Sequence, residues 1–168
     1  MPFRNKGTTM STEAMAPNST LPRPRTRDEA IVRAAAERIA AECAGWDRTS
    51  NAERWITALI NARPSWDDGY RLARELETYS MVRPDSALVE ILDNASMHLD
   101  DVHEEAERSW VRVVGFTPEF SVGDVVTFRH GTGPIHSIDG ARARYVVDVD
   151  RCGNGGIYAD AEEVTAAE

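Results

Sequence analysis

Lysine is almost absent from this chain, and cysteines, aromatic residues and long apolar runs are scarce. Of 168 residues, one is lysine (Lys6), two are cysteine (Cys43 and Cys152) and 7% are aromatic. Two cysteines cannot form the disulfide framework of a small secreted domain, and no Cys-x-x-Cys pair suggests zinc. No apolar run approaches the roughly 18 residues of a membrane helix, and no apolar segment typical of a signal peptide opens the chain. We therefore expect a cytoplasmic protein without membrane contact.

Acidic residues outnumber basic ones by 28 to 19, so the chain has a net charge of -9 at pH 7. The imbalance is uneven, because residues 1–27 have a net charge of +4, residues 28–114 of -8 and residues 115–168 of -5. Affinity for nucleic acid depends on neutralisation of phosphates by Lys and Arg. The acidic body is therefore not expected to bind nucleic acid, and a basic protein partner is expected instead.

Residues 1–27 are predicted to be a disordered tail. Ser, Thr, Asn and Pro dominate there, and apolar side chains are too few to offset the entropy lost on ordering. The tail holds three closely spaced arginines, Arg23, Arg25 and Arg27. A mitochondrial-type presequence is the alternative, since acidic residues are few, but no amphipathic run precedes Asp28.

Residues 28–115 are predicted to form a helical bundle. Thr26 is the expected N-cap of the first helix, with Glu29 at the capping-box position, and Gly45 is its expected end. The second helix is expected to begin after Thr49 or Ser50, with a capping box formed by Ser50 and Glu53, and to end before residue 64.

Two more helices complete the predicted bundle. The third is expected to open at Ser65, with an apolar stripe made of Tyr70, Leu72, Ala73, Leu76 and Tyr79. A fourth, long helix is expected to follow Pro84 and to continue as far as Gly115. Four helices joined by short loops are typical of a small bundle.

The spacing of apolar residues changes after Pro118, and short strands are predicted from there on. Val125–Phe128 is β-rich, residues 131–134 have turn composition, and Asp139-Gly140 is a hairpin signal that follows a strand at 135–138. Further strands are expected at residues 145–149 and 155–159. Several short strands at close spacing are typical of a small all-β barrel.

Four segments of this region follow one another in a familiar order. They are Val122-Gly123-Asp124-Val125-Val126, Gly131-x-Gly133-x-Ile135-x-x-Ile138, Tyr145-Val146-Val147 and Ala161-Glu162-Glu163-Val164. Together they resemble an SH3-like barrel of the KOW type. The resemblance implies that the first segment opens the first strand, that the third is a central strand and that the fourth closes the sheet. The expected fold class is α+β, with a disordered tail (1–27), a four-helix bundle (28–115) and an SH3-like small β-barrel (118–168).

The most unusual stretch of the sequence is the acidic run at residues 99–107. Asp100 with Glu104, and Asp101 with Glu105, are like-charge i,i+4 pairs, which destabilise a helix by about 0.2–0.5 kcal/mol each. We interpret the run as an acidic ridge that docks on a basic groove, and a solvated helix face is the alternative. The predicted partner-binding residues are Asp93, Asp100, Asp101, Glu104, Glu105, Glu107 and, as an aromatic near a helix end, Trp66.

The same run is a weak candidate for a metal site. His98, Asp101 and Glu105 lie at i, i+3 and i+7, and Asp100 with His103 has the carboxylate-x-x-His spacing of carboxylate-bridged sites. Such sites need matching ligands on facing helices, and no second Glu-x-x-His occurs. We therefore expect no metal and no other cofactor.

Catalytic residues are not expected either. Cys43 falls on the apolar face of the first helix, and Cys152 falls in a predicted exposed turn. No nucleophile is placed with His130 or His136 by a known local pattern.

The sequence favours a non-enzymatic acidic protein that binds and regulates, or inhibits, a basic and nucleic-acid-handling protein, with a phage or mobile element as a possible source. One alternative is an accessory subunit of a larger enzyme, because helices followed by an SH3-like barrel resemble the β-subunit of nitrile hydratase in broad order. Another is a nucleic-acid-binding KOW-type module that uses the Arg23–Arg27 tail together with the barrel.

Overall fold

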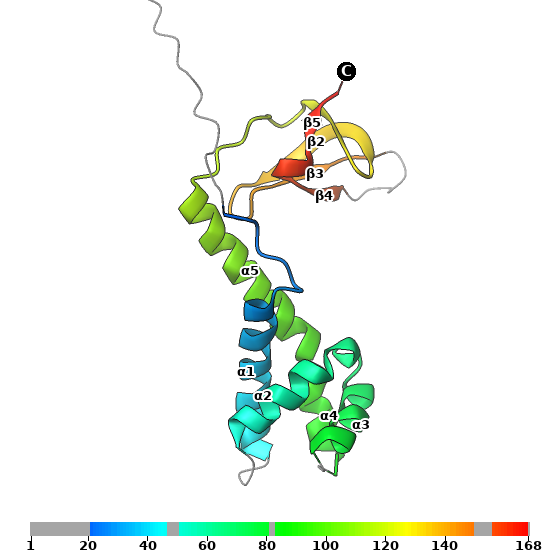
Figure 1. Cartoon of the computed structure of the whole chain (residues 1–168). Helices are drawn as coiled ribbons and strands as arrows, with labels where there is room; N and C mark the ends of the chain where they lie inside the picture. Colours follow the sequence, from blue (N-terminus) through cyan, green and yellow to red (C-terminus); the bar gives the residue numbers. More distant parts are fainter. Residues whose placement is uncertain (1–20, 47–50, 81–82, 150–155, 168) are drawn as a thin grey trace, which may run out of the picture.

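Residues 21–46, 51–80, 83–149 and 156–167 are described by a computed structural model of the chain (Figure 1). Helices come first and strands follow, so the α+β class is confirmed. The helical elements are α1 (Glu29–Trp46), α2 (Ala52–Asn61), the 3-10 helix η1 (Arg63–Ser65), α3 (Gly69–Ser80), α4 (Ser86–Leu92) and α5 (Ala95–Val114). The sheet elements are β1 (Val125–Phe128), β2 (Gly131–Asp139), β3 (Arg144–Val147), β4 (Ile157–Asp160), the 3-10 helix η2 (Ala161–Glu163) and β5 (Thr165–Ala166).

The helices enclose an apolar core of their own. In α1 the buried side chains recur at helical spacing, and this face packs against α2 and α5. Trp55, Leu59, Leu72, Leu76 and Leu88 are the largest of the fully buried apolar residues around it. The core occupies the end of the molecule opposite the sheet, and α5 extends from this core toward the sheet (Figure 1).

Side-chain caps set several helix ends. Asn51 accepts a hydrogen bond from the Glu53 backbone N–H at the start of α2, so Asn51 takes the role predicted for Ser50, which lies outside the described residues. Asp85 accepts from the Leu88 N–H at the start of α4. At the end of α5, Gly115 adopts a left-handed conformation, with φ of 69°.

The first helix and the third helix differ from the predictions at their ends. The first begins at Glu29 rather than after a cap at Thr26, and it continues past Gly45 to Trp46. The third begins at Gly69 rather than Ser65, because residues 63–65 form a 3-10 turn. Tyr70 and Tyr79 were predicted in its apolar stripe, but their side chains are 65% and 58% exposed.

The single long helix predicted after Pro84 is two helices. The helix is interrupted at Asp93 and Asn94, which separate α4 from α5. Asp93 Oδ1 accepts a hydrogen bond from the Gly69 N–H, the first residue of α3, at 3.0 Å. This bond ties the end of α4 to the start of α3. Among the described residues, the helical part has five α-helices, where four were expected.

The strands form one antiparallel sheet in the order β4-β3-β2-β1-β5. β4 and β5 are its edge strands, so the sheet is open and not closed into a barrel. Its core is small and separate from the helical one, and consists of Val126, Phe128, Ile135, Tyr145, Val147, Ala159 and Val164. The Tyr145 hydroxyl accepts hydrogen bonds from the backbone N–H groups of Glu119 and Phe120, which fixes the segment that enters the sheet.

The predicted turn at residues 131–134 is wrong. Gly131 and Pro134 lie inside β2, and the hairpin between β1 and β2 turns at Arg129 and His130. Gly133 is needed for close packing rather than for a turn, because a Cβ there would overlap the carbonyl oxygen of Asp148. The Asp139-Gly140 hairpin is confirmed, with β3 following at Arg144.

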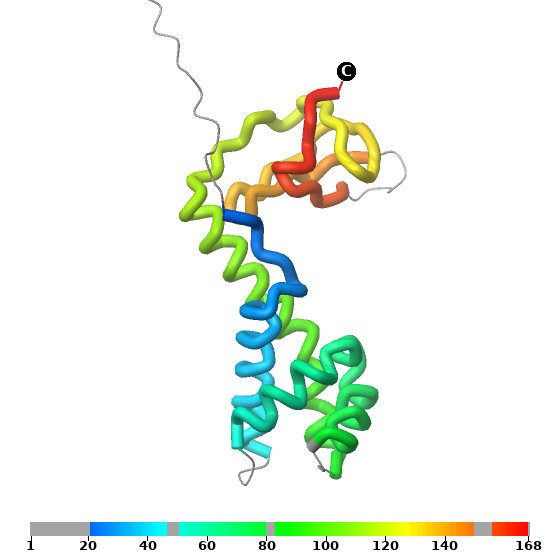
Figure 2. Tube along the Cα trace, viewed as in Figure 1, coloured from blue at the N-terminus to red at the C-terminus, as the bar shows by residue number. Residues whose placement is uncertain are grey.

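The predicted tail also needs correction. Residues 21–28 pass between the upper part of α5 and the sheet (Figure 2). The Leu21 carbonyl accepts a hydrogen bond from Trp110 Nε1, and the Thr26 carbonyl accepts one from Arg63. Residues 1–20 lie outside the described part of the chain. Among the described helices, none combines the length and apolarity that would let it cross a membrane.

Replacing Gly133 with alanine is expected to lower the free energy of unfolding by about 2 kcal/mol, because the new methyl group meets backbone and not a flexible side chain. Gly140→Ala is the matched control, since a Cβ at Gly140 has no atom within 4 Å. Urea unfolding followed by circular dichroism measures both. Equal stability of the two variants would contradict the packing described for β2.

Candidate functional site

Four of the acidic residues predicted to bind a partner lie within α5, as two pairs of neighbours in the sequence. Asp100 and Asp101 are exposed and have no ion pair with any residue in the described ranges. Glu105 pairs with Arg38 of α1 at 2.6 Å, and Glu104 pairs with Arg108. The negative charge of α5 is thus partly neutralised at the second pair and not at the first.

The two remaining surface predictions have different outcomes. Asp93 is exposed at the break between α4 and α5, although one of its oxygens is committed to the Gly69 N–H. Trp66 is 3% exposed, and its Nε1 donates to the Leu59 carbonyl oxygen at 3.0 Å. Trp66 is therefore a core residue, and its prediction as an interface residue is wrong, because the 3-10 turn before α3 folds its ring onto α2.

Glu107, like Trp66, was predicted to bind a partner but is buried, so that prediction is also wrong. Its side chain is 1% exposed, on the face of α5 that meets the sheet. One oxygen, Oε1, accepts hydrogen bonds from Arg23 at 2.9 Å and from Arg144 at 2.6 Å. Oε2 is buried and has no hydrogen-bond partner among the described residues. The carboxylate thus joins the N-terminal segment, α5 and β3.

Arg23 lies at the centre of this junction. It contacts Glu107, Glu162 and Asp160, and its guanidinium carbon lies 4.7 Å from the centre of the Trp110 ring. Burial by itself lowers the pKa of Arg23, but the hydrogen bond to Glu162 and the charges of Asp160 and Glu162 outweigh that effect and raise it. The group is therefore a permanent cation held among carboxylates.

The hairpin between β2 and β3 supplies two more arginines to the junction. Arg144 bonds Asp160 as well as Glu107. Arg142 bonds Asp139 at 2.7 Å and lies 3.7 Å from Glu104 of α5. The helical and sheet parts are thus in contact, and ion pairs form much of that contact.

A cavity of about 950 Å³ lies along the same junction. Charged side chains of both signs line it, together with three aromatic residues, Trp110, Phe116 and Tyr145. Its volume is in the range of small-molecule and peptide sites. Sequence reasoning missed this junction. The one local signal for it is the i,i+3 spacing that places Glu107 and Trp110 on one helix face.

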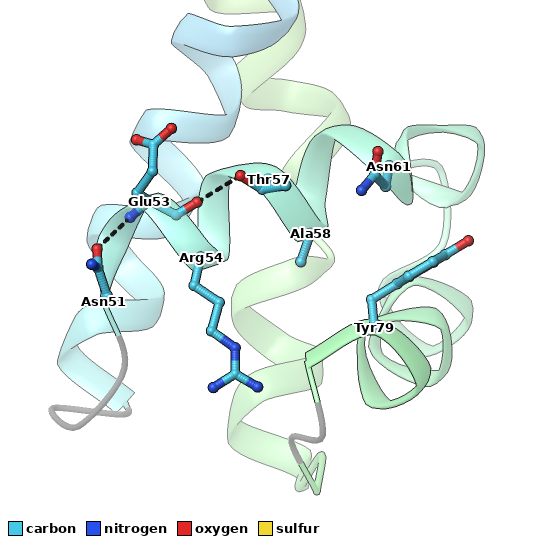
Figure 3. A pocket seen from close by; sticks show the side chains of 7 residues that line it. All are labelled: Asn51, Glu53, Arg54, Thr57, Ala58, Asn61 and Tyr79. Carbon is cyan, nitrogen blue, oxygen red and sulfur yellow. Dashed lines mark hydrogen bonds between the residues drawn. The ribbon is translucent and has the colours of Figure 1, made fainter.

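A smaller, shallow pocket of about 400 Å³ lies between α2 and the end of α3. Figure 3 shows Tyr79 on α3 and Asn61 at the end of α2 on one side of the pocket, and Arg54 projecting from α2. Two hydrogen bonds, between Asn51 and Glu53 and between Thr57 and Glu53, order its wall. None of the residues that line it combines a charge with full burial.

The residues considered for catalysis are placed apart from one another. Cys43 is fully buried in the helical core, where burial and then the charge of Glu42 raise the pKa of its thiol to about 12. Its thiol is therefore protonated at neutral pH. His130 lies edge-on to Phe128, and His136 lies 3.4 Å from Asp148. Cys152 lies outside the described residues.

The residues considered for metal binding do not converge either. His98 Nε2 lies 3.0 Å from Glu42 of α1, and His103 Nε2 lies 3.0 Å from the Pro24 carbonyl oxygen. Within the described ranges, no group of three or more His, Cys, Asp or Glu side chains could hold a metal ion.

No family model matches the chain, and no match was found among curated proteins or solved structures.

Glu107→Gln is expected to lower the free energy of unfolding by about 3 kcal/mol, because Arg23 and Arg144 would then share a neutral amide in a largely buried site. Glu105→Gln removes an exposed ion pair and is expected to cost less than about 0.5 kcal/mol. Urea unfolding of both variants measures the difference. A loss at Glu107 no larger than that at Glu105 would show that the buried network contributes little.

In a Cys152→Ser protein, the Cys43 thiol is expected to react with a disulfide reagent at pH 8 at least about 1,000-fold more slowly than in the unfolded chain. The raised pKa keeps the thiol protonated, and burial denies the reagent access. Absorbance of the released thiolate follows the reaction. Rapid labelling of the folded protein would contradict the burial of Cys43.

Proposed function

We propose that this protein is a non-enzymatic binding protein that presents the exposed acidic surface of α5 to a basic protein partner. The observation that carries the proposal is the pair Asp100 and Asp101. Both carboxylates face solvent without a cationic partner among the described residues, one turn before two further acids, Glu104 and Glu105. Such i,i+4 repulsion is unfavourable for the helix alone, and a cationic partner would relieve it.

The distribution of arginine supports the same proposal. In the described ranges, the arginines that pair with the run contact Glu104 and Glu105: Arg38 pairs with Glu105, and Arg108 and Arg142 pair with Glu104. Asp100 and Asp101 stay uncompensated beside them. Uncompensated charge of one sign raises the rate at which an oppositely charged partner associates.

We propose further that the sheet is an SH3-like module of the KOW type. The strand order β4-β3-β2-β1-β5 and the 3-10 turn η2 immediately before β5 support this assignment. A nucleic-acid role through the Arg23–Arg27 segment receives less support, because the Arg23 guanidinium is bonded within the protein. The proposed partner is a nucleic-acid-handling protein, whose basic channel would fit the carboxylates of α5.

Asp100→Asn with Asp101→Asn is expected to slow association with the basic partner about tenfold at low salt. The same change is expected to raise the free energy of unfolding by a few tenths of a kcal/mol, about 0.2–0.5 for each relieved pair. Loss of binding without loss of stability would separate the binding role of these residues from a structural one. The partner is first captured by cross-linking to the wild-type chain in lysate and then purified, and surface plasmon resonance measures association from about 50 to 500 mM salt.

Asp67→Asn with Glu90→Gln is the matched control. Both residues are exposed, lie outside α5 and have no ion pair among the described residues, so the control removes the same net charge. Its association rate is expected to fall less than twofold. The proposal is wrong if both double variants slow equally, if association is insensitive to salt, or if the wild-type chain captures no basic protein.

A further inference from the structure

The guanidinium of Arg23 has an acceptor for each of its five N–H groups. Nε donates to Glu162, Nη1 donates to Glu107 and to the Arg142 carbonyl oxygen, and Nη2 donates to the Ala143 carbonyl oxygen and to Glu162. The Nη1 and Nη2 bonds are 2.7–3.0 Å long. A planar fork of five donors is unique to guanidinium. An ammonium group, with three donors, could not satisfy this set.

An aromatic ring covers the guanidinium face. Trp110 lies 4.7 Å from the Arg23 guanidinium carbon, within the range of a cation–π interaction. The indole is itself fixed, because its Nε1 donates to the Leu21 carbonyl oxygen. The contacts around Arg23 therefore include in-plane hydrogen bonds and a stacked face.

The groups that accept hydrogen bonds from Arg23 belong to other elements than the N-terminal segment. Glu107 lies on α5, the Arg142 and Ala143 carbonyls lie in the β2–β3 hairpin, and Glu162 lies in η2. Contacts that do not involve Arg23 hold them, since Arg144 bonds Glu107, the Ala161 N–H bonds the Ala143 carbonyl oxygen, and Asp139 bonds Arg142. Contacts other than those of Arg23 thus hold the acceptors on α5 and in the hairpin, whereas the side-chain bonds of Glu162 are to Arg23.

Charge balance also calls for a cation here. Without Arg23, Glu107 and Asp160 would share one arginine, Arg144, and Glu162 would have no cationic partner among the described residues. The carboxylate of Glu107 is fully buried and has an oxygen with no hydrogen-bond partner in the described part of the chain. A buried, uncompensated carboxylate is costly, so the site favours occupation by a cation.

The Arg23 side chain makes most of the hydrogen bonds that join its segment to the rest of the protein. Besides that side chain, the backbone carbonyls of Leu21, Pro24 and Thr26 accept hydrogen bonds, from Trp110 and His103 of α5 and from Arg63. Leu21, Arg25 and Arg27 are exposed, and the cavity of about 950 Å³ runs alongside. Another arginine could therefore take over the larger share of these bonds.

We propose that Glu107, Trp110, Glu162 and the carbonyls of the β2–β3 hairpin form a guanidinium-binding site that accepts an arginine side chain from another molecule. In the chain by itself, Arg23 occupies this site. Release of residues 21–28 opens it, so the N-terminal segment competes with the ligand. Neither Asp100 nor Asp101 is among the residues that form the site, so this proposal does not depend on the proposed function.

Chemical rescue of a full-length Arg23→Ala variant tests the site. The variant is expected to melt at a lower temperature than the wild type, and methylguanidinium at about 20 mM is expected to restore at least about 2 °C with a saturable concentration dependence. Urea, a neutral planar analogue, and methylammonium, a cation without the fork, are expected to restore nothing at the same concentration. If Arg23→Ala is unfolded, methylguanidinium is expected to restore its helical circular dichroism with the same selectivity.

Arg33→Ala is the matched control, because Arg33 pairs with Glu37 and Glu53 on the exposed surface. It is expected to show no rescue. A second arm compares free L-arginine with a peptide copy of residues 21–26, each added to Arg23→Ala. Tighter binding of the peptide indicates an arginine carried by a protein, and equal binding indicates a free guanidinium compound. Equal responses to methylguanidinium, methylammonium and urea, or equal rescue of Arg33→Ala, would overturn the proposal.

Discussion

A single buried carboxylate, that of Glu107, joins the two parts of this protein. The helices and the sheet each have their own apolar core, and much of the junction between them is polar. Glu107 accepts from Arg23 and Arg144 on one oxygen, so the N-terminal segment, α5 and β3 meet at one atom. A buried charge is stable only when it is paired and hydrogen-bonded. The relative placement of helices and sheet therefore depends on these pairs, together with the packing of Phe116 and Phe120 on Tyr145.

This constraint divides the acidic residues of α5 by their position along the helix. Glu107 is buried against the sheet and paired with arginines, whereas Asp100 and Asp101 lie about two turns nearer the start of α5, are exposed and have no cationic partner among the described residues. The charge of Glu107 is thus neutralised inside the protein. The charges of Asp100 and Asp101 remain at the surface, and the proposed binding function rests on them.

The proposed guanidinium site would connect binding with the conformation of the N-terminal segment. Arg23 is bound through its side chain to three separate elements. If another arginine took over these bonds, the junction between the helices and the sheet would change, because Glu107 bonds both Arg23 and Arg144.

The sequence by itself determined the α+β class, the apolar faces of the helices, the positions of β1 and of the Asp139-Gly140 hairpin, and the sign of the charge, because these follow from local composition and periodicity. It did not determine the break at Asp93, the packing of Gly133 or the burial of Trp66, which depend on neighbours outside the local pattern. The junction was least accessible, since Arg23 and Glu107 are 84 positions apart. Tertiary structure decided which acidic residues are buried and paired. The sequence gives the charge of each residue but not whether water or a distant arginine surrounds it.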